Sequence, residues 1–231
     1  MRIVFMGTPD FSVPALKALV EAGHQVTAVV TQPDKPKGRG KDVQMTPVKI
    51  QALEYGIPVY QPVKVKTPEF VEVLKKEAPD AIVVIAFGQI LSKEILDLPK
   101  YGCVNIHASL LPKYRGAAPI QWAIINGESK TGVTTFLLNH EIDKGAILGQ
   151  VEMPIQPEDN VGTLYDRLMT VGADLVVQTV ERIAAGEITP VVQPDEDASL
   201  RPAPKIFKKD CLINWTQSGK RIIDFIRGLS P

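Results

Sequence analysis

The sequence predicts an α/β protein built around a mostly parallel sheet, and two observations carry this prediction. The chain opens with an apolar run at residues 3–6, a helical stretch at 15–22 and a β-branched run at 26–31. This strand–helix–strand order implies parallel pairing of the two strands. Further along, residues 81–86 form a continuous apolar run, which is typical of a strand buried on both faces.

Capping and turn residues delimit the remaining elements. Ser12 and Pro14 mark the start of the first helix, and Asn160 with Thr163 opens a long helix that Gly186 ends. The other expected helices cover 47–55, 68–77, 92–98, 119–126 and 218–227, and the other expected strands cover 57–60, 104–107, 132–138 and 146–153, the last at the antiparallel side of the sheet. Residues 191–209 are polar and rich in proline, which indicates an exposed connection.

Composition limits the functional class. The 231 residues include 26 basic and 26 acidic side chains, so the chain has no overall attraction to nucleic acid, and a polyanionic partner needs a local patch. Cys103 and Cys211 are too few for a disulfide framework and fit a reducing cytosol. The amino terminus is typical of a strand rather than a signal peptide, and no apolar run approaches the roughly 20 residues that span a bilayer. These features predict a cytoplasmic protein.

Asn105 and His107 are the leading candidates for chemistry. Side chains two residues apart on a strand project from the same face, and ligands of open α/β sheets bind at the carboxyl ends of the strands. Imidazole titrates near neutral pH, whereas an amide both donates and accepts hydrogen bonds. A purely structural histidine is the alternative, but the polar neighbour and the loop at 108–116 favour a functional one.

A carboxylate follows the next expected strand, at Asp143 in the loop 139–145. We expect this loop at the same sheet edge as His107, where an aspartate orients an imidazole. Spacing alone slightly favours the alternative, a turn carboxylate that binds its own backbone before Gly145. His140 receives no role.

Metal and nucleotide sites have weak support. Three histidines without a His-Glu-x-x-His arrangement or paired cysteines do not supply a zinc site, so we expect no metal. The first turn, Gly7-Thr8-Pro9-Asp10, lacks the dinucleotide-binding spacing. Thr8 and Asp10 remain candidates for lining a site.

A basic loop occupies residues 32–49. Its cations are Lys35, Lys37, Arg39, Lys41 and Lys49, against Asp34 and Asp42. Charge alone favours a solvated insertion, although a loop of this length is often functional and such a loop suits a phosphate backbone.

The motifs taken together resemble a known family. Asn105-x-His107-x-Ser109-Leu110-Leu111-Pro112, the stretch 115–121 and Asp143-x-Gly145 are similar to formyltransferases that use 10-formyltetrahydrofolate. The opening at 6–11 and the basic loop resemble those members that act on methionyl-tRNA. The similarity extends over essentially the whole chain.

The resemblance implies a Rossmann-like domain with Asn105, His107 and Asp143 as the catalytic set. It implies that Ser109, Leu110, Leu111 and Pro112 contact folate, and that the backbone at Phe87, Gly88, Gln89, Ile90 and Leu91 receives the pterin. It also implies that Lys35, Lys37, Arg39 and Lys41 touch the acceptor stem of the initiator tRNA. Acyl transfer is then expected without a covalent intermediate: Asn105 and His107 donate to the oxyanion, and Asp143 holds His107 and manages protons.

The resemblance also sets the expected domains. Residues 1–190 form the catalytic domain, and residues 191–231 a linker and the start of a carboxyl-terminal region. The family continues beyond the position of Pro231 into a β-barrel that assists tRNA binding, so a truncated chain with altered tRNA affinity is expected. We also expect a monomer. Lys144, where relatives often carry a small or neutral residue, should have only a local electrostatic effect.

Three other functions remain open. Sugar amine formyltransferases share the Asn-x-His and Ser-Leu-Leu-Pro core, although the basic loop favours tRNA. A 10-formyltetrahydrofolate hydrolase would replace the amine by water. A silent folate- or RNA-binding module is the alternative outside enzymes, and the intact Asn105, His107 and Asp143 argue against it.

Overall fold

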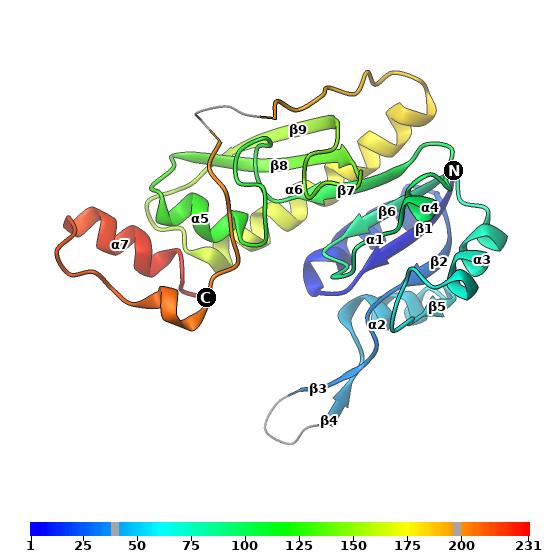
Figure 1. The fold of residues 1–231 in the computed structure, drawn as a ribbon, viewed down its shortest axis with the longest axis horizontal. Coiled ribbons are helices and arrows are strands. Elements are labelled where there is room, and N and C mark those ends of the chain that lie inside the picture. The colour runs from blue at the N-terminus through cyan, green and yellow to red at the C-terminus, as the bar shows by residue number, and fades with distance from the viewer. Residues whose placement is uncertain (38–41, 196–199) are drawn as a thin grey trace.

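A seven-stranded sheet forms the centre of the molecule in the computed structural model, which describes residues 1–37, 42–195 and 200–231 (Figure 1). The strands lie in the order β5-β2-β1-β6-β7-β8-β9. Their bounds are Arg2–Gly7 (β1), Gln25–Val30 (β2), Val59–Tyr60 (β5), Ala81–Ile85 (β6), Cys103–His107 (β7), Lys130–Leu137 (β8) and Ile147–Pro154 (β9). Pairing is parallel from β5 to β7 and antiparallel from β7 to β9. The predicted α/β fold with a mostly parallel sheet is confirmed.

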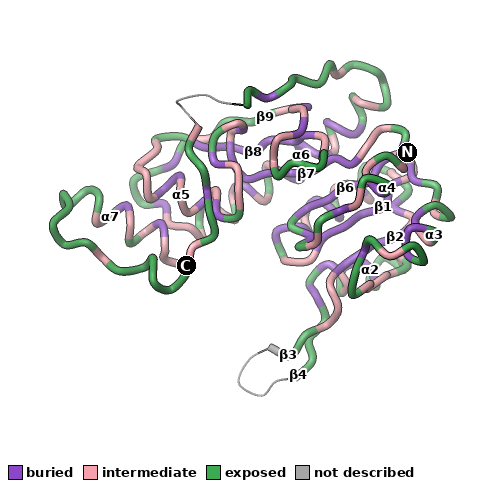
Figure 2. The backbone as a smooth tube through the Cα atoms, in the orientation of Figure 1, coloured by how far each residue is buried: buried purple, intermediate pink, exposed green. Residues whose placement is uncertain are grey.

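Helices cover both faces of the sheet because side chains alternate along each strand. Ile3 and Phe5 of β1 join the apolar cluster under α1, α2, α5 and α6, whereas Val4 and Met6 join the cluster under α3 and α4. The helices are α1 (Val13–Glu21), α2 (Pro47–Glu54), α3 (Pro68–Glu77), α4 (Lys93–Leu96), α5 (Pro119–Ile125), α6 (Val161–Ala184) and α7 (Gly219–Arg227), with short 3₁₀ helices η1 (Asp10–Ser12) and η2 (Lys208–Cys211). Figure 2 shows the buried backbone of β1, β6 and β8 between these layers.

Capping explains where the long helix begins. The side chain of Asn160 accepts a hydrogen bond from Thr163 N, and Thr163 Oγ1 accepts one from Asn160 N. This reciprocal pair satisfies backbone donors that the first helical turn leaves without partners. The predicted start of α6 is therefore confirmed.

The basic loop carries a two-stranded hairpin that the sequence analysis did not anticipate. Strands β3 (Lys35–Lys37) and β4 (Asp42–Gln44) pair antiparallel, and the hairpin projects away from the body of the protein (Figure 1). Asp34 at its base binds Lys49 Nζ at 2.5 Å and accepts a hydrogen bond from Gln61 Nε2 at 2.7 Å. The hydrogen bond from Lys49 lowers the pKa of Asp34. Lys49 is thereby engaged within the fold.

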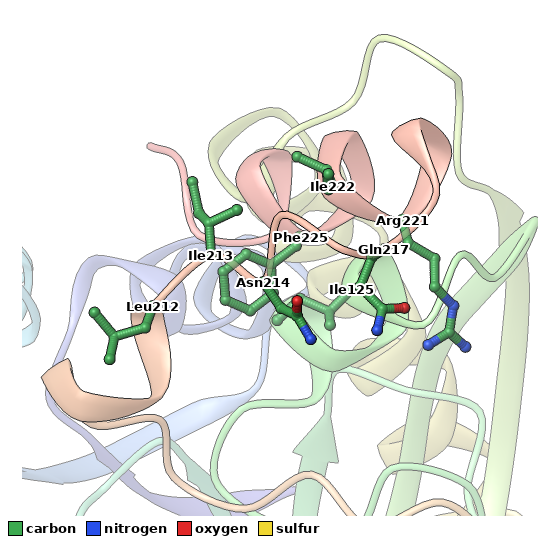
Figure 3. Close-up of a pocket in the computed structure, with 8 residues that line it drawn as sticks. All are labelled: Ile125, Leu212, Ile213, Asn214, Gln217, Arg221, Ile222 and Phe225. Atoms are coloured by element: carbon green, nitrogen blue, oxygen red, sulfur yellow. The ribbon is translucent and has the colours of Figure 1, made fainter.

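The chain after α6 runs beside the edge strand β9, where Val191 pairs with Ile147, before it reaches α7. Most of residues 191–209 are exposed, as expected for a connection, but Gln193 and Ala203 are buried against the loops that follow β7 and β8. Helix α7 then lies beside α5 (Figure 1). Between them is a cavity of about 130 Å³, into which Ile125 and Phe225 project (Figure 3).

None of the helices that the structure describes is long and apolar enough to cross a membrane.

Candidate functional site

Two cavities meet beside β7. The larger, of about 600 Å³, lies between the segment that follows β6 (residues 84–91) and the loop that follows β8 (residues 138–143). The smaller, of about 320 Å³, is bordered by Phe11, His107, Ile120 and Tyr165. Both cavities are lined by Ala86, Asn105, Gly116, Ala117 and Asp143. Two molecules bound side by side would therefore meet at these residues, and both volumes suit small-molecule groups.

His107 is held by a backbone carbonyl on one side of its ring. Its Nε2 lies 2.8 Å from Tyr114 O, and because a carbonyl only accepts, Nε2 carries a proton. Its Nδ1 faces the carboxylate of Asp143, with 3.8 Å between Nδ1 and Oδ2. Nδ1 is consequently the ring atom available for chemistry, as an acceptor in the neutral imidazole and as a donor in the charged one.

Asp143 reaches His107 by an unexpected route. We expected its loop at the carboxyl edge of β7, but β8 is antiparallel to β7, and Leu137 lies opposite Val104 near the start of β7. The loop turns back, and Asp143 Oδ2 accepts a hydrogen bond from Gly116 N at 2.8 Å. The carboxylate thus binds a different loop, rather than its own turn.

Backbone strain is concentrated at this junction. Ala86, Tyr114 and Asp143 have φ angles of 45°, 60° and 54°, in the left-handed region that favours glycine. Such conformations cost about 1–3 kcal/mol each and persist where the surrounding structure enforces them, often at functional sites. Here Ala86 lines both cavities, the carbonyl of Tyr114 binds His107, and the carboxylate of Asp143 faces His107.

Asn105 has an unused hydrogen-bonding atom. Its Oδ1 is buried and has no partner among the described residues. Buried polar atoms are normally paired, so an unpaired one beside two cavities is suited to a ligand.

The stretch from Ser109 to Pro112 is held by hydrogen bonds to backbone and to Thr134. Ser109 Oγ donates to Lys113 O, and Leu111 N donates to Thr134 Oγ1. Thr134 in turn donates to Ser109 O at 2.6 Å. Neither cavity is lined by this stretch. Its hydrogen bonds fix the turn that leads to Tyr114 and Gly116.

The residues expected to receive a pterin do border the larger cavity. Phe87 to Leu91 form one wall, in which Ile90 is 79% exposed and Phe87 is buried. Phe87 O accepts hydrogen bonds from Thr8 Oγ1 and Gln32 Nε2. The wall is therefore tied to the end of β1, and Thr8 supports the cavity from outside.

Asp10 and Tyr165 form a pair that links η1 to α6. The hydroxyl of Tyr165 donates to Asp10 Oδ1 at 2.7 Å and accepts from Phe11 N at 3.1 Å. Burial, followed by the interaction with Asp10, raises the pKa of Tyr165, so the phenol stays protonated. The sequence analysis missed Tyr165. It lies near the start of a helix, and no local pattern there predicts contact with Asp10 and Phe11, which are far away in the sequence.

Of the residues expected to contact tRNA, Lys35 and Lys37 belong to the hairpin that projects away from the body of the protein (Figure 1). Lys35 is exposed on β3, and Lys37 is on the same strand. Arg39 and Lys41 lie outside the described residues. In the described part of the chain, no group of three or more His, Cys, Asp or Glu side chains could hold a metal ion.

Comparison with known proteins identifies the family. The family described as formyl transferase matches residues 1–180. A methionyl-tRNA formyltransferase from Citrifermentans bemidjiense is 52% identical over 231 residues, which are 100% of this chain and 72% of the relative. The chain belongs to the formyl transferase family. It is therefore an enzyme of formyl-group transfer. A methionyl-tRNA formyltransferase from Bacteroides fragilis is 51% identical over 233 residues, again covering 100% of this chain and 72% of the relative.

Solved structures extend the likeness of the fold. An N-formyltransferase from Helicobacter canadensis, in complex with folinic acid and dTDP-3-aminofucose, matches with a TM-score of 0.73 and 24% identity over 98% of this chain and 79% of its own. HypX from Aquifex aeolicus in complex with tetrahydrofolic acid matches with a TM-score of 0.70 and 19% identity, covering 99% of this chain and 34% of its own. At these identities the likeness concerns the fold alone.

Proposed function

We propose that this formyltransferase moves the formyl group of 10-formyltetrahydrofolate to the α-amine of initiator methionyl-tRNA, and so supports translation initiation. The observation that carries the proposal is the junction of the two cavities at Asn105 and Asp143. A donor in the larger cavity and an aminoacyl group in the smaller one would bring their reacting atoms together there. Kinship with methionyl-tRNA formyltransferases supports this acceptor. The reaction then belongs to the cytoplasm, and we propose a monomer as the active species.

The reaction proceeds by direct attack. The neutral α-amine attacks the formyl carbon, a carbon–nitrogen bond forms, and the carbonyl oxygen becomes an oxyanion. The bond from the formyl carbon to the folate nitrogen then breaks, and the proton lost by the amine passes to that nitrogen. The products are formylmethionyl-tRNA and tetrahydrofolate, without a covalent intermediate on the enzyme.

Asn105 and His107 stabilise the oxyanion in this mechanism. Asn105 lines both cavities and can donate through Nδ2, and His107 has Nδ1 free because Nε2 is bound to Tyr114 O. Donation through Nδ1 requires the charged imidazole, which the carboxylate of Asp143 faces. Loss of one such donor typically lowers the rate about 100- to 1000-fold. Asp143 orients His107 and relays the amine proton.

The substrates occupy different surfaces. We propose that residues 87–91 receive the pterin, and that the stretch 109–112 supports the site through its hydrogen bonds to Thr134 instead of touching folate. Lys35, Lys37, Arg39 and Lys41 bind the phosphate backbone of the acceptor stem. We also propose residues 1–190 as the catalytic domain, which the family match at 1–180 supports.

The decisive experiment is transfer of a labelled formyl group. The chain and its His107→Ala variant are each given labelled 10-formyltetrahydrofolate with methionyl-tRNA, with a nucleotide-linked amino sugar, or with no acceptor. Label on methionyl-tRNA with the wild type alone supports the proposal. Label on the amino sugar alone identifies a sugar amine formyltransferase, release of formate without an acceptor identifies a hydrolase, and folate binding without turnover identifies a binding module.

A further inference from the structure

Gln193 uses all the hydrogen-bonding capacity of its carboxamide inside the protein. Its Nε2 donates to Asp143 O at 2.9 Å and to Gly145 O at 2.7 Å. Its Oε1 accepts from Arg115 Nε at 3.1 Å and from a terminal nitrogen of the Arg115 guanidinium at 2.8 Å. Two donors and two acceptor positions are the full inventory of an amide. The residue is buried, although the stretch around it is polar and mostly exposed.

These four hydrogen bonds join the segment after α6 to the two loops of the site. Gln193 binds the backbone on both sides of Lys144 in the loop that follows β8, and it binds Arg115 in the loop that follows β7. Arg115 also donates to Pro194 O. In Figure 1 this part of the chain runs beside the edge strand β9, where Val191 pairs with Ile147. Gln193 therefore lies where three segments distant in sequence converge.

The hydrogen bonds from Gln193 and from Gly116 N hold Asp143 in its observed conformation. This residue has a φ angle of 54°, in the left-handed region that is uncommon for residues other than glycine. Gln193 binds its carbonyl, while Gly116 N, adjacent to Arg115, binds its carboxylate at 2.8 Å. Removing the carboxamide would leave the carbonyls of Asp143 and Gly145 without these partners and free the loop to relax. The carboxylate would then move relative to His107 Nδ1.

Backbone pairing keeps the segment in place on either side of Gln193. Val191 exchanges two hydrogen bonds with Ile147, at 2.8 and 2.9 Å. Ala203 N donates to Arg115 O at 2.8 Å, and Ala118 N donates to Ala203 O at 3.1 Å. The segment is thus docked by its main chain, and the Gln193 side chain is not needed merely to attach it.

We propose that Gln193 is a positioning residue for formyl transfer, which acts by holding the Asp143 carboxylate opposite His107. This inference rests on the proposed function. Gln193 borders neither cavity, so it contacts neither substrate in this arrangement. Its effect should appear in the rate of the chemical step rather than in substrate binding.

Two substitutions and one control test the proposal. Gln193→Ala removes all four hydrogen bonds. Gln193→Glu retains an acceptor for Arg115 but places an oxygen where Asp143 O and Gly145 O need a donor. Trp122→Phe is the control, because Trp122 Nε1 donates to Pro204 O at 2.8 Å and so binds the same segment away from the site.

Both Gln193 variants should lower kcat by about 10- to 100-fold, because a displacement of about 1 Å at a reacting group has an effect of that order. The KM values for folate and for methionyl-tRNA should stay within about threefold, as expected when an interaction specific to the transition state is lost. Trp122→Phe should keep its kcat. Wild-type kcat in Gln193→Glu would overturn the proposal.

A double-mutant cycle separates positioning from a general loss of structure. If Gln193 acts through Asp143, Gln193→Ala should have almost no further effect on single-turnover transfer in an Asp143→Asn background, because residues acting as one unit are not additive. An equal loss in both backgrounds would contradict the proposal. Hydrogen exchange at the Gly116 amide provides a readout without turnover, and it should speed up in Gln193→Ala but not in Trp122→Phe.

The two proposals fail in different ways. If the wild type does not formylate methionyl-tRNA, the proposed function is wrong, whereas the exchange experiment still reports on Gln193. Unchanged exchange at Gly116 in both Gln193 variants would refute the positioning role even in an active enzyme.

Discussion

The two cavities that meet at Asn105 are built in different ways. The larger cavity is bordered mainly by two continuous stretches, residues 84–91 and 138–143. The smaller cavity is bordered by many short pieces, which come from the turn after β1 and η1, β7, the turn before α5, the start of α5, the loops after β6 and β8, and α6. Figure 1 shows how far apart these elements are along the chain. One site therefore depends on local loop conformation, whereas the other depends on the packing of the whole domain.

This difference indicates how each substrate site can change. A loop wall with exposed side chains such as Ile90 can be altered without disturbing the core. Phe11 in the smaller cavity is buried, and its ring packs edge-on against Tyr165 with 5.1 Å between the ring centroids. A change there affects folding as well as binding. Substitutions at the junction should lower the rate of transfer, whereas substitutions away from it should change the binding of one substrate only.

The largest effect is expected at the junction. Asn105→Ala should lower kcat about 100- to 1000-fold, because it removes a group that stabilises the oxyanion. Folate binding should remain largely intact, because most of the larger cavity is formed by other residues. Steady-state formyl transfer together with a direct folate-binding measurement checks this. Near-normal turnover would remove Asn105 from the mechanism.

The next effect should concern the smaller cavity alone. Phe11→Leu keeps an apolar side chain but loses the aromatic contact, so the KM for methionyl-tRNA should rise about 5- to 10-fold, equivalent to ~1 kcal/mol of apolar contact. The KM for folate should not change. Kinetics with each substrate varied in turn would measure both values. A matching rise for folate would show that the cavities do not act separately.

A smaller effect should concern the larger cavity alone. Ile90→Ser removes an exposed apolar side chain at its border, so folding should be unaffected. The KM for folate should rise about fivefold, equivalent to ~1 kcal/mol of lost apolar contact. The KM for methionyl-tRNA is the internal control. No change in either value would mean that folate does not contact Ile90.

Substitution of Asp224 should change neither KM, because this residue lies on α7 outside both cavities. Its carboxylate binds Lys220 Nζ at 2.6 Å and Arg227 Nε at 3.0 Å. Asp224→Asn should lower the free energy of unfolding by about 1–3 kcal/mol, since the buried side chain at position 224 loses the charge that strengthens its hydrogen bonds to Lys220 and Arg227. Urea unfolding and steady-state kinetics test the two statements. Altered kinetics would show that α7 is coupled to the site.

The lowered pKa values of Asp224 and Asp159 predict how the stability of the fold depends on pH. Burial by itself raises the pKa of each group, but hydrogen bonds outweigh this effect and leave both pKa values lowered. Asp159 accepts hydrogen bonds from Gln156 N and Arg167. Asp224 accepts hydrogen bonds from Lys220 and Arg227. Their stabilisation is therefore fully present above the unfolded-state value of about 3.9 and is lost as the pH falls through the folded-state values. Thermal unfolding between pH 7 and pH 2 should show that loss in the wild type and less of it in Asp224→Asn.

Sequence periodicity was sufficient for much of the architecture because it reflects local physics. Apolar runs predicted the strands of the parallel sheet, and the Asn160–Thr163 pair predicted the start of α6. The alternation of side chains on β7 predicted that Asn105 and His107 share one face of the strand, and both border the smaller cavity. The hairpin of β3 and β4 was not predicted, because lysine, proline and glycine have low strand propensity and the pairing depends on contacts across the loop.

The sequence by itself determined the α/β class, the candidate pair on β7 and the resemblance to formyltransferases, because these depend on residue type and short spacing. Only the tertiary structure decided which groups meet. It placed Asp143 against His107 although β8 runs antiparallel to β7, brought Tyr165 to the smaller cavity, and brought Gln193 to the loop of Asp143. These contacts join residues up to 155 positions apart, and no local propensity encodes a meeting that chain topology and core packing produce.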